Sequence, residues 1–296
     1  MALVKKFGLS AALTTPYDTA GNILLSDIAD HAKFCLANGC DSVTAFGTTG
    51  EGSSIGVRER GEVLSALASA GIIGEQIVAG VLVDSIADAA DQMAQALDAG
   101  ARNILLAPPS YFKNVSDDGL FNWFSAVIRQ LGTKARDVIV YNIPSVTMVK
   151  ISVELIARLR KAFPLVVTGV KDSGGDWTHT ERLLKEHGDL AIMIGDERHL
   201  AQGTRLGGQG AISGMANLLG KEVRAMAVDG REDSRVTDLV NIILNYPVTP
   251  AVKVLVAHTT GNPIWLNVRP PLVTVAPEDR GRISQAFDRT FATKAA

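Results

Sequence analysis

A lysine that ends an apolar run is the residue whose chemistry is easiest to state. Lys171 follows the run 166–170, and with the two-residue period of a strand it points to the same side as Val167 and Gly169. If that side is buried, loss of hydration disfavours the ammonium form and favours a free amine, which can attack a carbonyl and form a Schiff base. A lysine that merely ends a strand in solvent is the alternative for this segment taken alone.

A tyrosine and a glycine-rich loop follow two other apolar runs. Tyr141 precedes Asn-Ile-Pro, which ends a strand and leaves a phenol that can give a proton to a developing hydroxyl and take it back. Packing of the ring, with its hydroxyl at the surface, is the alternative. The loop 47–52 offers successive backbone N–H groups and the hydroxyls of Thr48 and Thr49, which suit either a carboxylate cradle or a structural turn.

These side chains converge only if the runs before them are strands of one parallel sheet. Short apolar runs alternate with helical patterns as far as about residue 215, which is typical of repeated βα units. Eight runs are predicted to be strands: 8–14, 42–46, 77–82, 103–107, 138–143, 166–171, 190–195 and 210–213.

The helices between the runs have recognisable ends. Ser26 and Ser85 are predicted N-caps, and Gly39 and Gly100 stop the helices that follow them. After residue 221 the β runs cease and the chain has a helical pattern. In that part Thr249 is a predicted cap, with Pro250 in the first turn and Gly261 at the end.

Eight βα units favour a closed (β/α)₈ TIM barrel over an open doubly wound sheet. The predicted division is a barrel with the active site over residues 1–221 and a C-terminal helical region over residues 222–296. In such a barrel the reactive groups lie at the C-terminal ends of the strands. That is where Lys171, Tyr141 and the loop 47–52 are all expected.

Composition excludes several classes of protein. The 296 residues are 47% hydrophobic, and 29 Lys+Arg stand against 31 Asp+Glu, so the chain lacks the basic surplus of a nucleic-acid binder and the polarity of a disordered chain. No run approaches the ~20 apolar residues of a membrane span. Two cysteines, Cys35 and Cys40, indicate a chain without structural disulfides, and Cys35 lies on an apolar helical stripe. We expect a cytoplasmic protein with no nucleic-acid or membrane partner.

Other candidate groups carry weaker signals. The five histidines show no i, i+4 pair with a nearby carboxylate, so no metal site is expected. Asp196 and Glu197 follow the seventh run either as an acid/base pair or as carboxylates at a helix start, and the second interpretation is favoured. The run 207–214 lies where barrels often bind phosphate but contains no Lys or Arg.

Five segments together resemble one family. They are 47–51 (GTTGE), 141–144 (YNIP), 169–172 (GVKD), 195–196 (GD) and 207–213 (GGQGAIS). In this order and spacing they are similar to the dihydrodipicolinate synthase/N-acetylneuraminate lyase family, whose members are class I aldolase-type (β/α)₈ enzymes, and the resemblance covers most of the chain.

The resemblance implies a role for each matching residue. Lys171 would form the Schiff base with pyruvate or another 2-keto acid, without a metal or cofactor, and Tyr141 would shuttle protons. Thr48 would link Tyr141 to a proton relay, and Thr49, with the backbone N–H groups of the pair, would hold the keto-acid carboxylate. Ile212 stands where a backbone carbonyl lies near the bound keto acid.

The resemblance also implies a homo-oligomer, a dimer or a tetramer. In many members a tyrosine from the neighbouring subunit completes the relay. Here Tyr111 is the candidate, although Phe112 stands at the equivalent position if no gap is allowed.

One departure bears on the substrate. In the synthase subgroup an arginine five residues after the tyrosine binds the carboxylate of the aldehyde substrate, and here that position is Val146. An apolar side chain cannot replace a charge-assisted bidentate contact. Three other arginines, Arg102, Arg129 and Arg136, precede strands and are expected at the opposite face of the barrel.

We therefore expect a Schiff-base lyase, an aldolase or dehydratase acting on a hydroxylated or sugar-derived 2-keto acid. A 4-hydroxy-tetrahydrodipicolinate synthase, which condenses pyruvate with aspartate semialdehyde in lysine biosynthesis, is the alternative. A non-catalytic barrel that binds a keto acid is the second alternative. The presence of Lys171, Tyr141 and Thr48 together favours an enzyme.

Overall fold

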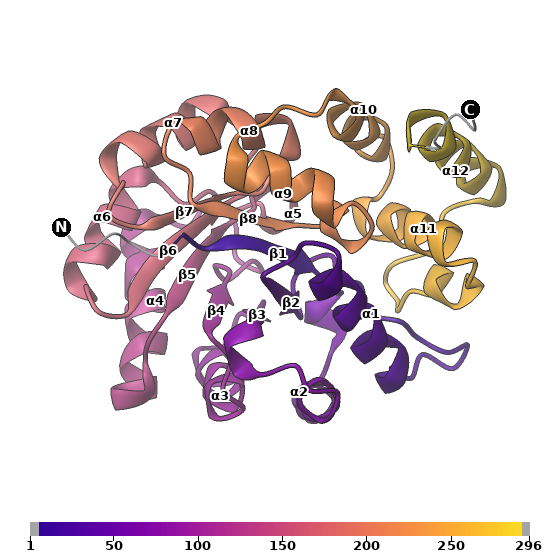
Figure 1. Ribbon diagram of the computed structural model, residues 1–296. Helices are drawn as coiled ribbons and strands as arrows, with labels where there is room; N and C mark the ends of the chain where they lie inside the picture. Colours follow the sequence, from indigo (N-terminus) through magenta and orange to yellow (C-terminus); the bar gives the residue numbers. More distant parts are fainter. Residues whose placement is uncertain (1–5, 292–296) are drawn as a thin grey trace.

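Eight parallel strands pair in chain order and close on themselves. In the computed structural model, which describes residues 6–291, β1 pairs with both β2 and β8 (Figure 1). The strands are β1 Gly8–Ala12, β2 Ser42–Ala45, β3 Ile77–Val81, β4 Asn103–Leu106, β5 Val138–Asn142, β6 Val167–Asp172, β7 Ala191–Ile194 and β8 Gly210–Ser213. The predicted barrel is confirmed, and every predicted run agrees with its strand to within two residues at each end.

Helices surround the barrel and extend beyond it. They are α1 Leu25–Ala37, α2 Val57–Ser69, α3 Ile86–Asp98, α4 Asp117–Leu131, α5 Pro144–Thr147, α6 Val153–Ala162, α7 Trp177–Glu186, α8 Glu197–Arg205, α9 Gly220–Asp229, α10 Ser234–Ile243, α11 Val248–Thr260 and α12 Pro277–Phe291. Short 3₁₀ helices lie at η1 Gly52–Ser54, η2 Gly74–Gln76, η3 Gly132–Lys134, η4 Met215–Asn217 and η5 Pro263–Leu266. None of the helices within 6–291 is long and apolar enough to cross a membrane.

The strands are buried on both faces, as parallel strands under helices must be. One apolar cluster fills the space between sheet and helices, and a second, smaller one fills the lumen. Ile139, Met193 and Ile212 belong to the lumen cluster, together with the ring of Tyr141. Because Lys171 pairs in register with Tyr141 and Met193, its side chain is directed to the same interior.

Two of the predicted helix caps are wrong. The hydroxyl oxygen of Ser85 accepts from the Asp88 N–H, which confirms that cap. Ser26, however, lies inside α1, and its hydroxyl donates to the neighbouring Asp27 carboxylate. Thr249 lies inside α11, and its hydroxyl donates to the carbonyl of Thr48 in a tertiary contact instead of capping the helix.

The C-terminal helices lie on one side of the barrel, with α11 and α12 drawn in yellow at the right of Figure 1. Helix α9 follows β8 and packs on β1, so it takes the place of the eighth barrel helix. The predicted boundary at residue 221 falls within α9. The division into two regions stays a prediction, and α10 and α11 are the helices of the second region that reach the pocket.

Candidate active site

The lysine amine lies inside the barrel, next to a phenol. Lys171 Nζ donates to Tyr141 Oη at 3.3 Å and lies 4.4 Å from the centre of the tyrosine ring. The side chains are carried by the neighbouring strands β6 and β5, and the residues are 6% and 1% exposed. The alternative of a solvent-exposed lysine at a strand end is therefore wrong for Lys171.

The glycine-rich loop adds a hydroxyl to this pair. Thr48 Oγ1 lies 3.3 Å from Tyr141 Oη, so the amine, the phenol and the hydroxyl touch in series. The loop bends sharply because Phe46 and Glu51 take the left-handed conformation, with φ of 62° and 56°. A Cβ on Gly52 would lie 1.8 Å from the Phe46 carbonyl oxygen, so this turn requires glycine.

A pocket of about 300 Å³ opens over these groups at the C-terminal ends of the strands. Lys171, Tyr141, Thr48, Thr49 and Ile212 all line it, so the structure brings the predicted catalytic and substrate-binding residues together. Helices α10 and α11 cover one side of the pocket, since their residues Val240, Ile243, Val248, Thr249 and Val252 also line it.

The predicted relay tyrosine does not lie in this pocket. Tyr111 is 78% exposed on the loop after β4, where its ring meets Phe112 edge to face at 5.3 Å. Phe112 is itself 71% exposed. A role for Tyr111 in the site of a neighbouring copy stays a prediction.

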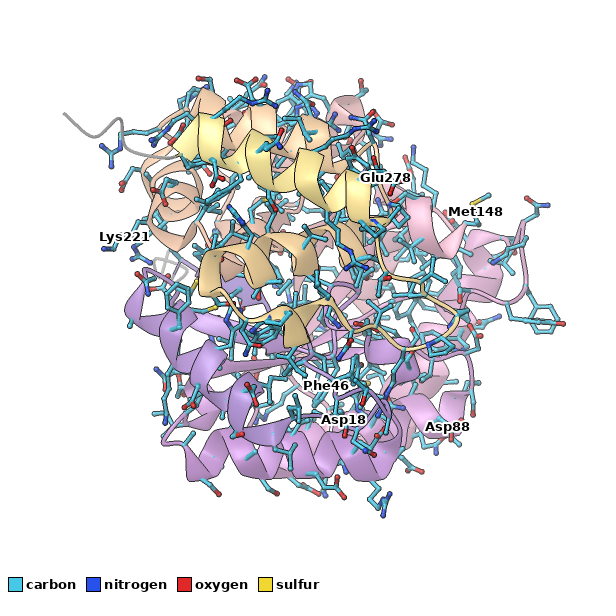
Figure 2. The ribbon with its side chains drawn as sticks, turned by 90° about the vertical axis from the view of Figure 1, so that its right-hand side faces the viewer. Asp18, Phe46, Asp88, Met148, Lys221 and Glu278 are labelled. Carbon is cyan, nitrogen blue, oxygen red and sulfur yellow. The ribbon has the colours of Figure 1, made fainter. Side chains whose placement is uncertain are left out.

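Val146 stands at the edge of the pocket and is 58% exposed. It lies on the short helix α5, which follows β5; nearby Met148, at the end of that helix, projects from the molecule's periphery (Figure 2). Arg102 and Arg136 line a separate depression with Phe7, at the N-terminal end of the barrel, as expected.

One arginine in the pocket was missed. Arg198 lines the pocket, and its guanidinium pairs with the carboxylate of Asp196 through two hydrogen bonds of 2.9 and 2.7 Å. Its place directly after the seventh predicted strand was a signal that could have found it. Asp196 also caps α8 by accepting from the Arg198 N–H, so the helix-start interpretation holds for this carboxylate.

Glu197 does more than begin a helix. Its Oε1 accepts from Ser213 Oγ at 2.5 Å, and the residue is buried and lines the pocket. Burial raises the pKa of the Glu197 carboxyl above its ordinary value, although the bond from Ser213 and the charge of Lys171 oppose this. The pocket therefore contains a buried carboxyl group that is held more strongly in its neutral form than an exposed one.

A buried aspartate fixes the strands beneath the site. Asp172 follows Lys171, and its carboxylate accepts from Asn142 Nδ2 at 2.8 Å and from Thr180 Oγ1 at 2.7 Å, with His179 Nδ1 at 3.2 Å. Burial alone would raise the pKa of Asp172, but these hydrogen bonds outweigh it and hold that pKa below its ordinary value. The bond to Asp172 in turn raises the pKa of His179. The cluster joins β5, β6 and α7.

Residues 6–291 contain no cluster of side chains typical of a metal site, and both cysteines are buried. No three His, Cys, Asp or Glu side chains in that span are placed to hold a metal ion. Cys35 and Cys40 are free and buried, and burial raises the pKa of Cys40 to about 12. They behave as core residues.

A closed (β/α)₈ barrel that carries a buried amine beside a phenol at its C-terminal end has the groups that a class I, Schiff-base aldolase-type enzyme requires. The chain belongs to the dihydrodipicolinate synthetase family, whose model matches residues 5–289. It is thus a Schiff-base lyase of that family.

Two curated relatives and a solved structure show the extent of the similarity. An uncharacterized DapA-like lyase from Chloroflexus aurantiacus is 31% identical, over 96% of this chain and 97% of the relative. The 4-hydroxy-tetrahydrodipicolinate synthase of Staphylococcus carnosus is 29% identical over 95% of each chain. The crystal structure of dihydrodipicolinate synthase from Agrobacterium tumefaciens is 69% identical, with a TM-score of 0.95 over 97% of this chain and 100% of that chain.

Proposed function

We propose that Lys171 is the Schiff-base lysine and that its partner is the keto group of pyruvate or another 2-keto acid. Lys171 Nζ attacks C2 and loses its two protons as the C2=N bond forms; Tyr141, 3.3 Å from the amine, carries protons to the oxygen, the C2–O bond breaks, and the oxygen leaves as water. Thr48, 3.3 Å from Tyr141, links the phenol to a proton relay through its hydroxyl. Thr49 and the loop N–H groups hold the carboxylate, beside the carbonyl of Ile212.

A pyruvate trap tests this assignment. Pyruvate with borohydride should add one reduced adduct, detected by intact mass and located on the peptide that contains Lys171. Lys171→Ala should remove the adduct while the far-UV circular dichroism stays that of a folded barrel. Labelling of another lysine, or none with any 2-keto acid, would contradict the assignment.

For the substrate we propose a hydroxylated or sugar-derived 2-keto acid that is cleaved or dehydrated. The observation that carries this is the buried Glu197 carboxyl, hydrogen-bonded to Ser213 at 2.5 Å, in the same pocket as Lys171. Carboxyl and hydroxyl groups are partners for substrate hydroxyls. A second substrate carboxylate would instead face Val146, which offers it no hydrogen bond.

Cleavage of the substrate's C3–C4 bond requires a base and the imine on Lys171, and the pocket supplies both. A base, Tyr141 in its phenolate form, takes the proton of the substrate's C4 hydroxyl, the C3–C4 bond breaks, and its electrons pass into the imine to give an enamine and an aldehyde. Protonation at C3 and hydrolysis then release pyruvate and restore Lys171. In a dehydration, C3 loses a proton and C4 loses its hydroxyl as water.

The second candidate is the 4-hydroxy-tetrahydrodipicolinate synthase reaction, in which pyruvate condenses with aspartate semialdehyde. The names of the relatives favour it over the first candidate, above all the 69% identity to a structure described as a dihydrodipicolinate synthase. Arg198 is a cation in the pocket that could meet the semialdehyde carboxylate, although its guanidinium is already paired with Asp196. The side chains around Lys171 favour the first candidate.

One assay series decides between the two. For a panel of hydroxylated 2-keto acids, cleavage is followed by pyruvate release with a coupled dehydrogenase and dehydration by the loss of water in the product's mass, and pyruvate plus aspartate semialdehyde is assayed in parallel. We expect kcat/KM of about 10⁴ M⁻¹s⁻¹ or more for a member of the panel. If the semialdehyde reaction reaches that range and the panel gives nothing, the second candidate replaces the first.

We also propose that the protein is a homo-oligomer, with Tyr111 placed toward a neighbouring site. The support is the exposure of Tyr111 and Phe112, two aromatic side chains on one loop that are 78% and 71% exposed. Exposed aromatic clusters of this kind are typical of contact surfaces.

A further inference from the structure

A buried ion pair lies behind the glycine-rich loop, outside the pocket. Lys253 Nζ, on α11, lies 2.6 Å from Glu51 Oε1, and both side chains are 0% exposed. The same amine donates to the Thr15 carbonyl at 2.8 Å. Lys253 is not among the residues that line the pocket. Its ammonium group contacts Glu51 and Thr15 instead.

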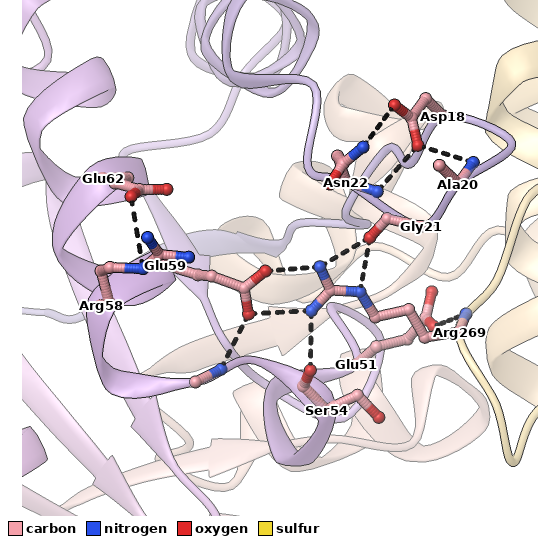
Figure 3. Close-up of polar contacts among 11 residues, drawn as sticks. Asp18, Ala20, Gly21, Asn22, Glu51, Ser54, Arg58, Glu59, Glu62 and Arg269 are labelled. Atoms are coloured by element: carbon pink, nitrogen blue, oxygen red, sulfur yellow. Dashed lines mark hydrogen bonds and ion pairs between the residues drawn. The ribbon is translucent and has the colours of Figure 1, made fainter.

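The second oxygen of Glu51 is held from another direction. Glu51 Oε2 accepts from the backbone N–H of Arg269 at 2.9 Å (Figure 3). The Arg269 side chain is itself anchored on the Glu59 carboxylate at 2.5 Å and on the Gly21 carbonyl at 2.6 Å. Both carboxylate oxygens of Glu51 therefore have fixed partners.

Glu51 belongs to the turn that carries the two threonines. Its backbone is left-handed, with φ of 56°, and its N–H donates to the Thr48 carbonyl at 3.1 Å. A residue other than glycine is strained in the left-handed backbone conformation, and it stays there only where surrounding contacts hold it. The bonds to Lys253 and Arg269 are contacts of that kind.

The helix that carries Lys253 touches the same turn at a second point. Thr249 Oγ1 donates to the Thr48 carbonyl at 3.2 Å. Residues four apart lie on one face of a helix, so Thr249 and Lys253 present adjacent groups to the loop. One face of α11 thus fixes both the Thr48 carbonyl and the Glu51 carboxylate.

We infer that Lys253 is a positioning residue for the carboxylate cradle: through Glu51 it fixes the turn that holds Thr48 and Thr49 in place for a 2-keto acid. This inference rests on the proposed roles of the two threonines. A buried ion pair adds little to stability compared with apolar residues of the same volume, so the geometry of the loop is a better reason for its presence. Lys253 touches no substrate and takes no part in bond making.

The test compares Lys253→Met with the unchanged protein in the borohydride trap. Methionine keeps an unbranched side chain of similar length and removes the charge. We expect the pyruvate concentration for half-maximal trapping to rise at least about tenfold, the effect of losing a well-placed hydrogen bond to a carboxylate. At saturating pyruvate the adduct on Lys171 should reach the same stoichiometry, since the amine is untouched.

Two controls make the result decisive. Lys185→Met removes an exposed lysine paired with Glu181 on α7, and it should leave the half-maximal concentration unchanged. If Lys253→Met does not fold, the double variant Glu51→Gln/Lys253→Met removes both charges without leaving either unpaired, and the same tenfold rise is expected in its folded fraction.

The outcomes separate the two proposals. If the unchanged protein forms no adduct with any 2-keto acid, the proposed function fails and the positioning role with it. If it forms the adduct but the folded variant shows a rise of less than about tenfold, only the positioning role is overturned. A fall in melting temperature with unchanged half-maximal trapping would mean that the pair is structural.

Discussion

Lys171, Tyr141 and Thr48 touch in series, with 3.3 Å from the amine to the phenol and 3.3 Å from the phenol to the hydroxyl. A proton released at one end of this series has a direct route to the other. Because Lys171 and Tyr141 are almost fully buried, water competes little for these contacts.

The phenol of Tyr141 can be tested without disturbing its ring. Tyr141→Phe keeps the packing in the lumen and removes the hydroxyl that lies between Lys171 and Thr48. Turnover should fall by about 10²–10⁴-fold, the usual contribution of general acid–base catalysis. Steady-state kinetics with the best substrate measure this, and a loss below about tenfold would assign Tyr141 to packing.

Glu197 should make stability depend on pH. Burial raises its pKa in the folded chain above the ordinary 4.5, so between these two pKa values the folded state binds more protons than the unfolded state. The free energy of unfolding contributed by this group therefore falls as pH rises through that window. Glu197→Gln has no proton to lose, and its stability relative to the unchanged protein should improve with rising pH.

Urea unfolding of both proteins between about pH 5 and pH 8 measures this difference. Ser213→Ala serves as a comparison, because it removes the hydroxyl that bonds to Glu197 and leaves the carboxyl itself. A difference between Glu197→Gln and the unchanged protein that stays constant with pH would contradict the assignment.

Sequence patterns were enough to find some of these residues and not others. Lys171 and Tyr141 each end an apolar run, so the barrel geometry alone brings them together. Arg198 and Glu197 follow a strand too, but charged residues at a helix start have an ordinary explanation in the helix dipole. Lys253 lies about 200 residues from Glu51 in the chain, and no local pattern pairs them.

The position of the Lys171 amine depends on how strand β6 is held by its neighbours. Lys171 is in register with Tyr141 on β5, and the next residue, Asp172, is in register with Asn142. Asn142 and Thr180 donate to the Asp172 carboxylate, which ties β6 to β5 and to α7. The cluster fixes the strand directly below the reactive side chain.

Removing this carboxylate should destabilise the barrel strongly. Asp172→Ala leaves the buried donors of Asn142, His179 and Thr180 without their acceptor, at an expected cost of about 3–5 kcal/mol in the free energy of unfolding. The control Asp98→Ala removes an exposed partner of Lys134 and should cost about 1 kcal/mol or less. Urea denaturation measures both, and similar losses in the two variants would contradict this role of Asp172.

Strands were predicted better than helix ends for a physical reason. Each strand is a short apolar run that must be buried on both faces, so composition alone marks it. A helix cap depends on where one hydroxyl finds its hydrogen bond. Thr249 bonds to the Thr48 carbonyl across the molecule instead of capping α11, and nothing near it in the sequence signals that partner.

Exposed apolar side chains follow two neighbouring strands, on the loop after β4 and on the short helix α5 after β5 with its C-cap. Tyr111, Phe112, Val146 and Met148 are 58–78% exposed. Burial of such groups between copies would stabilise an assembly by the hydrophobic effect.

We expect light scattering after size-exclusion chromatography to give two or four times the chain mass of 31.3 kDa. Replacing both Tyr111 and Phe112 with serine should shift the mass toward that of one chain if this loop lies in the contact. A single-chain mass for the unchanged protein would exclude the assembly, and an unchanged mass in the variant would place the contact elsewhere.

The pairing of β1 with β8 has a consequence for the order of events during synthesis. Residues Gly8 to Ala11 of β1 cannot pair with β8 until Gly210 to Ser213 have been synthesised. Until then β1 and β7 each present a row of unpaired backbone groups. The turn that contains Thr48 and Glu51 gains its tertiary contacts later still, because their partners Thr249 and Lys253 leave the ribosome after the last strand. The pocket is therefore finished last, and we expect a nascent chain stopped before α11 to be inactive even when all eight strands are present.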